Sequence, residues 1–147
     1  MAYAVIVPRQ KKIINDFFTI FVNLLILTMG FTFKIEKKTS YAVLSLEGNL
    51  LDKSSASGML NDIDNLIAEE IKSFILDLSG LLHVNSNGLN VFVTILTKAR
   101  NAGGEVVISN VSEKIKPLLI MTKLNTVFTV TKSTKSAAGA LKLRAKK

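Results

Sequence analysis

The chain has 147 residues, of which 48% are hydrophobic and 20% are charged. This composition predicts one folded domain and argues against a disordered chain. The absence of cysteine and the presence of one histidine, His83, exclude disulfides, thiolate chemistry and a multi-histidine metal site. The net charge of +8 lies at the two ends, because residues 31–130 hold ten basic and ten acidic side chains. A neutral middle argues against nucleic-acid binding, and the basic ends are typical of solvated tails.

Residues 1–30 form an apolar N-terminal extension, in which a basic cluster at residues 9–12 precedes an apolar run at residues 17–27. Three interpretations are open. The run is a signal-peptide core, or a membrane-associated segment, or translated sequence upstream of a true start at Met29. We favour the third, and we expect membrane contact only if residues 1–30 are native.

The remainder divides into a predicted folded domain at residues 31–130 and a basic tail at residues 131–147, in which a short helix is compatible with the sequence. Alternating apolar residues predict a β-hairpin over residues 31–48. A loop and a helix to about Glu70 follow, with Asp52, Ser54 or Ser55 as the candidate cap.

The apolar run at residues 73–80 predicts a strand buried on both faces, followed by a loop at residues 80–88. A second helix is predicted from Asn87 to about Asn101. Its expected core-facing residues, at helical spacing, are Leu89, Phe92, Val93, Leu96 and Arg100.

Residues 105–109 predict another buried strand, and Ser112 is expected to cap a third helix that contains Pro117. A last short strand is predicted at residues 127–130. Strands connected through helices should be parallel. The predicted order ββαβαβαβα therefore indicates an α/β fold with a single mixed β-sheet, an N-terminal hairpin and helices packed against the sheet.

The segment Asn85-Ser86-Asn87-Gly88 lies where the second predicted helix begins, at the carboxyl end of a strand. Ligands and modifications gather at such positions in open α/β sheets. Ser86 or Asn87 is interpreted as a helix N-cap. Ser86 is also a candidate phosphorylation site, because a helix N-terminus offers free N–H groups and a favourable dipole. Gly88 leaves the hydroxyl group unshielded.

Other polar residues near this loop carry weaker signals. Asn49 and Asp52 follow the second predicted strand and are candidates for the same surface as Ser86. Asp77 and His83 are interpreted as ordinary structural residues. No acid–base pair, metal cluster or phosphate-binding loop is visible, so we expect neither an enzyme nor a cofactor.

The stretch from Phe74 to Val130, with the preceding VLSLEGNL, resembles the STAS domain and, more narrowly, the bacterial anti-sigma factor antagonists. That family has a strand with Asp-Leu-Ser, a helix that opens with Asp-Ser-Ser/Thr-Gly-Leu, and a Gly-Gly turn. This chain has the corresponding segments, with two departures: Asn85 replaces the aspartate and Asn87 replaces the second hydroxyl residue.

The resemblance implies a cytoplasmic regulator that works by partner switching. In such proteins, an anti-sigma factor that is also a serine kinase binds the unmodified antagonist and releases the sigma factor. Phosphorylation of the first serine in the motif, here Ser86, ends this binding, and a phosphatase reverses it. The expected partner-binding residues are Asn85, Asn87, Gly88, Leu89, Asn49 and Asp52.

The two asparagines also suggest an alternative. The chain would then be a constitutive STAS interaction module, such as a subunit or regulator of a membrane transporter, without phospho-switching.

Overall fold

The computed structural model describes residues 17–21 and 30–145, and the chain divides into two units, residues 1–30 and 31–147. In the first unit, residues 17–21 are helical and all are exposed, and the large apolar side chains among them are Phe17, Phe18, Ile20 and Phe21. The three interpretations of the N-terminal extension concern a segment that lies mostly outside the described residues. Within the described ranges, no helix combines the length and the apolar character needed to cross a membrane.

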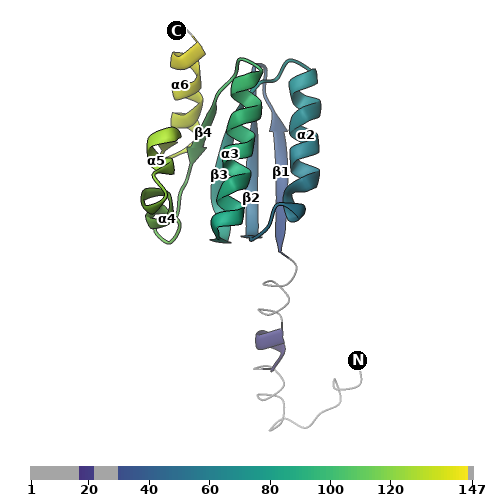
Figure 1. The fold of residues 1–147 in the computed structure, drawn as a ribbon, viewed down its shortest axis with the longest axis vertical. Coiled ribbons are helices and arrows are strands. Elements are labelled where there is room, and N and C mark those ends of the chain that lie inside the picture. Colours follow the sequence, from purple (N-terminus) through teal and green to yellow (C-terminus); the bar gives the residue numbers. More distant parts are fainter. Residues whose placement is uncertain (1–16, 22–29, 146–147) are drawn as a thin grey trace. The chain divides into compact units, whose positions relative to one another are not determined.

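The second unit is built on a five-stranded mixed sheet (Figure 1). The strands lie in chain order: β1 (Phe31–Lys37), β2 (Tyr41–Leu50), β3 (Ser73–Val84), β4 (Val106–Ser109) and β5 (Thr129–Thr131). β1 and β2 form the expected antiparallel hairpin, and each later strand is parallel to the strand before it. The predicted hairpin, mixed sheet and α/β class are confirmed.

Helices connect the parallel strands. In chain order they are the 3₁₀ helix η2 (Ser54–Ala56), α2 (Ser57–Ala68), α3 (Ser86–Asn101), α4 (Lys116–Met121), α5 (Leu124–Val127) and α6 (Thr134–Ala145). The third predicted helix is thus two short helices, α4 and α5. It starts at Lys116 instead of Ser112, so Pro117 occupies the first turn, where a missing N–H group costs nothing.

Both faces of the sheet are covered by helices. Alternate residues such as Leu44, Leu76 and Ile108 belong to the main core, which also contains the buried faces of α2 and α3. Their neighbours along the strands face the opposite way, as the period of two requires. The smaller cluster on that second face contains Val43, Ile75, Val107, Ala137 and Leu141. The basic C-terminal segment therefore supplies a helix, α6, that packs against the sheet.

The predicted loop at residues 80–88 is wrong, because β3 continues to Val84. Gly80 lies inside the strand at a shift in the β2–β3 register, and a Cβ atom there would lie 3.1 Å from the carbonyl oxygen of Leu46. A glycine of this kind marks a bulge and a close approach, instead of a strand end. His83 consequently lies in β3, and only Asn85 separates β3 from α3.

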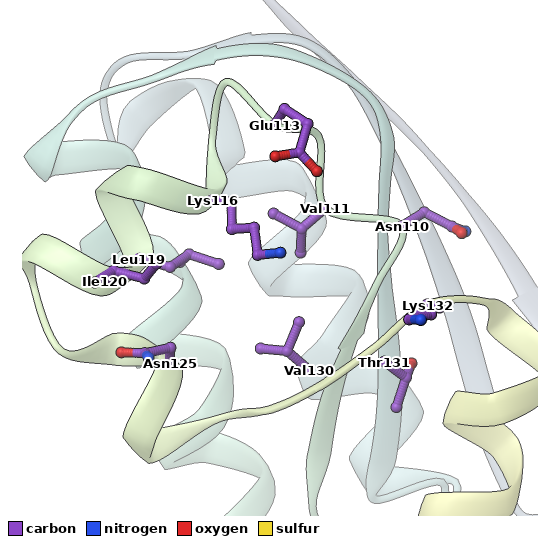
Figure 2. Close-up of a pocket in the computed structure, with 10 residues that line it drawn as sticks. All are labelled: Asn110, Val111, Glu113, Lys116, Leu119, Ile120, Asn125, Val130, Thr131 and Lys132. Carbon is purple, nitrogen blue, oxygen red and sulfur yellow. The ribbon is translucent and has the colours of Figure 1, made fainter.

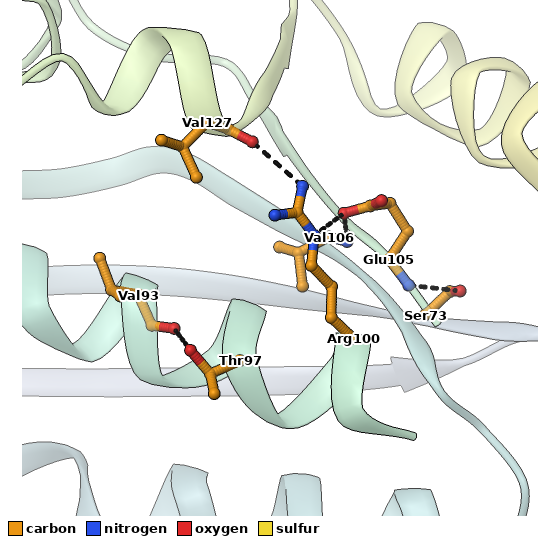
Figure 3. A network of polar contacts seen from close by, with 7 residues as sticks. All are labelled: Ser73, Val93, Thr97, Arg100, Glu105, Val106 and Val127. Atoms are coloured by element: carbon orange, nitrogen blue, oxygen red, sulfur yellow. Dashed lines mark hydrogen bonds and ion pairs between the residues drawn. The ribbon is translucent and has the colours of Figure 1, made fainter. Parts of the chain in front are cut away.

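The core-facing side of α3 also differs from the prediction. Val93 is 36% exposed, and Arg100 is exposed at the last turn. The Arg100 guanidinium donates hydrogen bonds to Glu105 Oε1 at 3.2 Å and to the carbonyl oxygen of Val127 at 3.3 Å (Figure 3). The Glu105 N–H in turn donates to Ser73 Oγ at 3.2 Å. This network connects the end of α3 to α5 and to the first residues of the neighbouring strands.

The packing of α6 predicts a stability effect that a solvated tail would not show. Leu141 is 7% exposed in the second-face cluster. Replacing Leu141 with Ala should lower the free energy of unfolding by about 2 kcal/mol, because apolar contacts are lost. Urea titration followed by circular dichroism measures this. Lys142, the next residue, is exposed, so Lys142→Ala should change the free energy of unfolding by less than about 0.5 kcal/mol. Equal unfolding curves for the two variants would contradict a structural role for α6.

Candidate functional site

The N-terminus of α3 is capped by Asn85. Its Oδ1 atom accepts the N–H of Gly88 at 2.9 Å, and its carbonyl oxygen accepts the N–H of Leu89 at 2.9 Å. Its backbone is extended, as is usual for an N-cap. The prediction that Ser86 or Asn87 is the cap is therefore wrong by one or two residues, and Ser86 is the first residue of the helix.

Ser86 presents an accessible hydroxyl group at this helix start. The residue is exposed, and within the described part of the chain its side chain forms no hydrogen bond. The N–H groups of Ser86 and Asn87 come too early in α3 to find an intrahelical carbonyl. An anionic group on Ser86 would therefore lie next to free N–H donors and the positive end of the helix dipole.

Gly88 brings the start of α3 into direct contact with the end of β2. A Cβ atom on Gly88 would lie 2.1 Å from the carbonyl oxygen of Leu50 and 2.6 Å from Cγ2 of Val84. No side chain fits in this space. Gly88 therefore permits the close approach of helix and strand, in addition to leaving the Ser86 hydroxyl uncovered.

The expected partner-binding residues divide into two layers. Asn85, Asn87 and Asp52 are exposed, as is Ser86. The others lie beneath them: Asn49 is 1% exposed, Leu89 is 4% exposed, and Gly88 is buried. Asn49 is enclosed because it pairs with His83 inside the β2–β3 ladder, and Leu89 is enclosed because it faces the main core. These three residues hold the surface in place, and the buried side chains of Asn49 and Leu89 are not available for contact with a partner.

Asp52 supplies a negative charge just beyond the end of β2. Its Oδ1 atom accepts hydrogen bonds from Ser55 Oγ and Ser55 N, both at 2.7 Å, and from Ser54 Oγ at 2.8 Å. The bonds from Ser55, and then that from Ser54, hold the pKa of Asp52 below its ordinary value. Asp52 is thus ionised at neutral pH. Its bonds stabilise the turn into η2, and that contribution is lost only as the pH falls through the lowered pKa.

An uncharged stripe continues from Ser86 along the exposed side of α3. It consists of Ser86, Asn90, Val93 and Thr97, at the three- and four-residue spacing that places side chains on one helix face. Thr97 Oγ1 donates to the carbonyl oxygen of Val93 at 2.9 Å (Figure 3). We call these four residues the α3 stripe. The sequence prediction missed Val93 as a surface residue because it placed Val93 in the core.

Two further polar residues have structural surroundings. Asp77 Oδ1 accepts hydrogen bonds from Asn110 Nδ2 and from the Ser79 N–H, each at 3.0 Å, which joins β3 to the loop after β4. The structural interpretation of Asp77 is confirmed. His83 Nε2, in β3, lies 3.4 Å from Nζ of Lys114, which belongs to the loop after β4. Among the residues that the structure describes, no group of three or more acidic or histidine side chains is placed to hold a metal ion.

Two glycines in the first turns of neighbouring helices provide a matched test of the β2–α3 contact. Gly88→Ala should destabilise the fold by about 1–3 kcal/mol, because the Leu50 carbonyl has to move. A Cβ atom on Gly58 of α2 would meet no neighbouring atom within 4 Å, so Gly58→Ala should stabilise the fold by about 0.5–1 kcal/mol. Urea titrations measure whether each substitution raises or lowers the free energy of unfolding. A stabilised Gly88→Ala protein would contradict the close approach.

Known proteins share both the sequence pattern and the fold. The sequence profile of the STAS domain family matches residues 32–137. A solved anti-sigma factor antagonist from Mycobacterium paratuberculosis has 18% sequence identity and a TM-score of 0.63, with 77% of this chain and 95% of that chain covered. A variant of RsbS from Moorella thermoacetica has 21% identity and a TM-score of 0.66, with 78% and 98% covered. Bacillus SpoIIAA in its phosphorylated form has 17% identity and a TM-score of 0.59, with 74% and 98% covered. The structural likenesses support the same fold, and the profile match over most of the sequence shows that this chain belongs to the STAS domain family.

Proposed function

We propose that this chain is an anti-sigma factor antagonist. It binds an anti-sigma factor that is also a serine kinase, releases a sigma factor, and is switched off by phosphorylation of Ser86. The observation that carries the proposal is the exposed hydroxyl of Ser86 at the first position of α3. The names of the structural neighbours support the same role, since they include anti-sigma factor antagonists and a phosphorylated SpoIIAA. A phosphatase would restore the binding form.

The helix start is suited to carry a phosphate without unfolding. Asn85 already satisfies the Gly88 N–H, whereas the N–H groups of Ser86 and Asn87 remain available to an anion. A negative charge in the first turn of a helix is stabilising by about 0.3–1 kcal/mol. Phosphorylation would therefore leave the fold intact and change the surface alone.

The α3 stripe explains why this change would release a partner. Its four residues are uncharged, and Val93 adds an exposed apolar side chain to them. A phosphoserine adds a charge of about −1.5 to −2 at neutral pH. Burying that charge against a partner surface with no matching cation costs several kcal/mol, so the complex dissociates.

A constitutive interaction module is the second candidate, and Asn85 is the observation that favours it. Its amide is engaged in the N-cap, and it supplies no carboxylate beside Ser86. In this version the serine is only the first residue of a helix, and the same surface binds a fixed partner, such as part of a membrane transporter. In both versions we expect a non-enzymatic regulator in the cytoplasm, which binds proteins and does not bind nucleic acid.

Partner capture with the full chain distinguishes the two candidates. Wild-type, Ser86→Ala and Ser86→Asp baits are compared in native cell extract and then against the purified partner. We expect a kinase-type partner that binds wild type and Ser86→Ala and is weakened at least about a hundredfold by Ser86→Asp, a difference of roughly 2.7 kcal/mol.

Ser57→Asp is the matched control for this experiment. Ser57 is also an exposed serine at the first position of a helix, α2, and its hydroxyl group donates to the Ser54 carbonyl oxygen at 2.9 Å. Ser57→Asp therefore adds the same charge at a helix start outside the α3 stripe. The Ser57→Asp bait should bind the partner as tightly as the wild-type bait does. Equal binding by the Ser86→Asp bait would refute the switch and favour the constitutive module.

The absence of a carboxylate at position 85 predicts an effect on the rate at which Ser86 is phosphorylated. Asn85→Asp keeps the N-cap, because Asn and Asp cap helices about equally well. It also adds a carboxylate next to the Ser86 hydroxyl. If this group acts as the base for phosphoryl transfer, the kinase should phosphorylate the variant at least about tenfold faster than wild type. Phosphate incorporation is measured by mass spectrometry with the purified kinase. Asn87→Asp is the control for charge alone, and equal rates for the two variants would exclude a specific role at position 85.

A further inference from the structure

Within the folded domain, the basic side chains are concentrated in one part of the fold. Residues 31–109 carry seven basic and nine acidic side chains, whereas residues 110–142 carry six lysines and one acidic residue, Glu113. The second segment comprises the loop after β4, the helices α4 and α5, the edge strand β5, and most of α6. The neutral total over residues 31–130 therefore conceals a separation of charge between two parts of the fold.

An open depression lies within this basic segment, between the loop after β4, the two short helices and β5. Its volume is about 630 Å³. The lining residues are Asn110, Val111, Glu113, Lys116, Leu119, Ile120, Asn125, Val130, Thr131 and Lys132. Figure 2 shows the side chains of Val111, Lys116 and Val130 pointing toward its centre. The floor is thus apolar, and a lysine reaches across it.

The cations of the depression have no acidic partner. Within the described part of the chain, neither Lys116 nor Lys132 forms an ion pair or a side-chain hydrogen bond. By contrast, Lys34, Lys37 and Lys98, on the other side of the domain, are all paired with carboxylates. An unpaired lysine above apolar side chains is suited to receive a carboxylate from outside.

Large apolar side chains surround the depression on the same elements. Ile120 is 53% exposed, Met121 is 78% exposed, Val127 is 42% exposed and Val130 is 40% exposed. They extend beyond the depression itself, over α4, α5 and β5, which is typical of a protein-docking surface and exceeds what a small ligand would cover. The Arg100 guanidinium donates a hydrogen bond to the Val127 carbonyl oxygen at 3.3 Å, which connects α5 to the end of α3.

We propose that this surface, which we call the Lys116 face, binds an acidic segment of a partner protein. A large apolar side chain of that segment enters the depression against Val111, Leu119 and Val130. Flanking aspartate or glutamate residues pair with Lys116 and Lys132. The inference goes beyond the proposed antagonist function, because it concerns different residues and does not depend on the state of Ser86.

Synthetic peptides test the proposal with the full chain. The probe is a fluorescein-labelled Asp-Glu-Asp-Leu-Phe-Glu-Asp-Glu peptide, with binding followed by fluorescence anisotropy and its location by amide chemical shifts. One comparison peptide carries Ser-Ser in place of Leu-Phe, and another carries amides in place of the carboxylates. We expect the probe to bind at least about tenfold more tightly than either, with shifts at Val111, Leu119 and Val130.

Charge-matched variants identify the contact. Lys116→Glu should weaken probe binding at least about tenfold. Lys142 is an exposed lysine near the end of α6, and Lys142→Glu should leave the affinity for the probe within about twofold of that of wild type. Ile120→Ser, at a half-exposed position, should weaken binding without unfolding the chain. Equal binding by the Lys116→Glu and Lys142→Glu proteins would overturn the proposal. Binding to phosphatidylserine vesicles that Lys116→Glu abolishes, with no binding of the probe, would assign the face to a membrane surface and also overturn it.

Discussion

The contact between Gly88 and the Leu50 carbonyl is the constraint on which the candidate site depends. It places the start of α3 directly against the end of β2, with no room for even one methyl group. β3 runs into α3 through Asn85 alone, and Asn85 is itself held by the cap bond to Gly88. The backbone around Ser86 is therefore fixed from both sides, while the Ser86 side chain is directed to the surface. A modification at such a position acts by adding charge to a rigid surface and does not need a conformational change.

Much of this arrangement can be predicted from the sequence. Period-two and helical patterns indicate the correct order of strands and helices. The end of α3 is indicated by Lys98 and Arg100 in its last turn and by the two glycines that follow, Gly103 and Gly104. The failures have local physical reasons. Gly80 suggests a strand end, although a glycine within a strand can equally mark a bulge where two backbones approach. That error moves the predicted end of β3 and leaves Ser86 or Asn87 as the predicted cap, one or two residues after the true cap, Asn85. All three are good capping residues, so only the true end of the strand selects among them.

The remaining differences come from packing, which periodicity describes only roughly. α3 buries a wide face because Gly88 brings it close to the sheet, and Val93 then lies at the border of that face. The C-terminal segment has the composition of a solvated tail because its lysines dominate it. Its small apolar residues, with Leu141, nevertheless complete the second face of the sheet. A helix that packs through one narrow contact carries little periodic signal in its sequence.

The separation of charge within the fold bears on where a phospho-switch can work. The α3 stripe is uncharged, so a phosphate on Ser86 would make it negative and penalise any partner that buries it. The same phosphate on the Lys116 face would meet the unpaired lysines of that face, which would offset part of its charge. A switch therefore requires a neutral surface, whereas steady binding of an acidic segment requires a basic one. The Lys116 face and the α3 stripe share no residue, so one interaction can engage the basic face continuously while a second responds to Ser86.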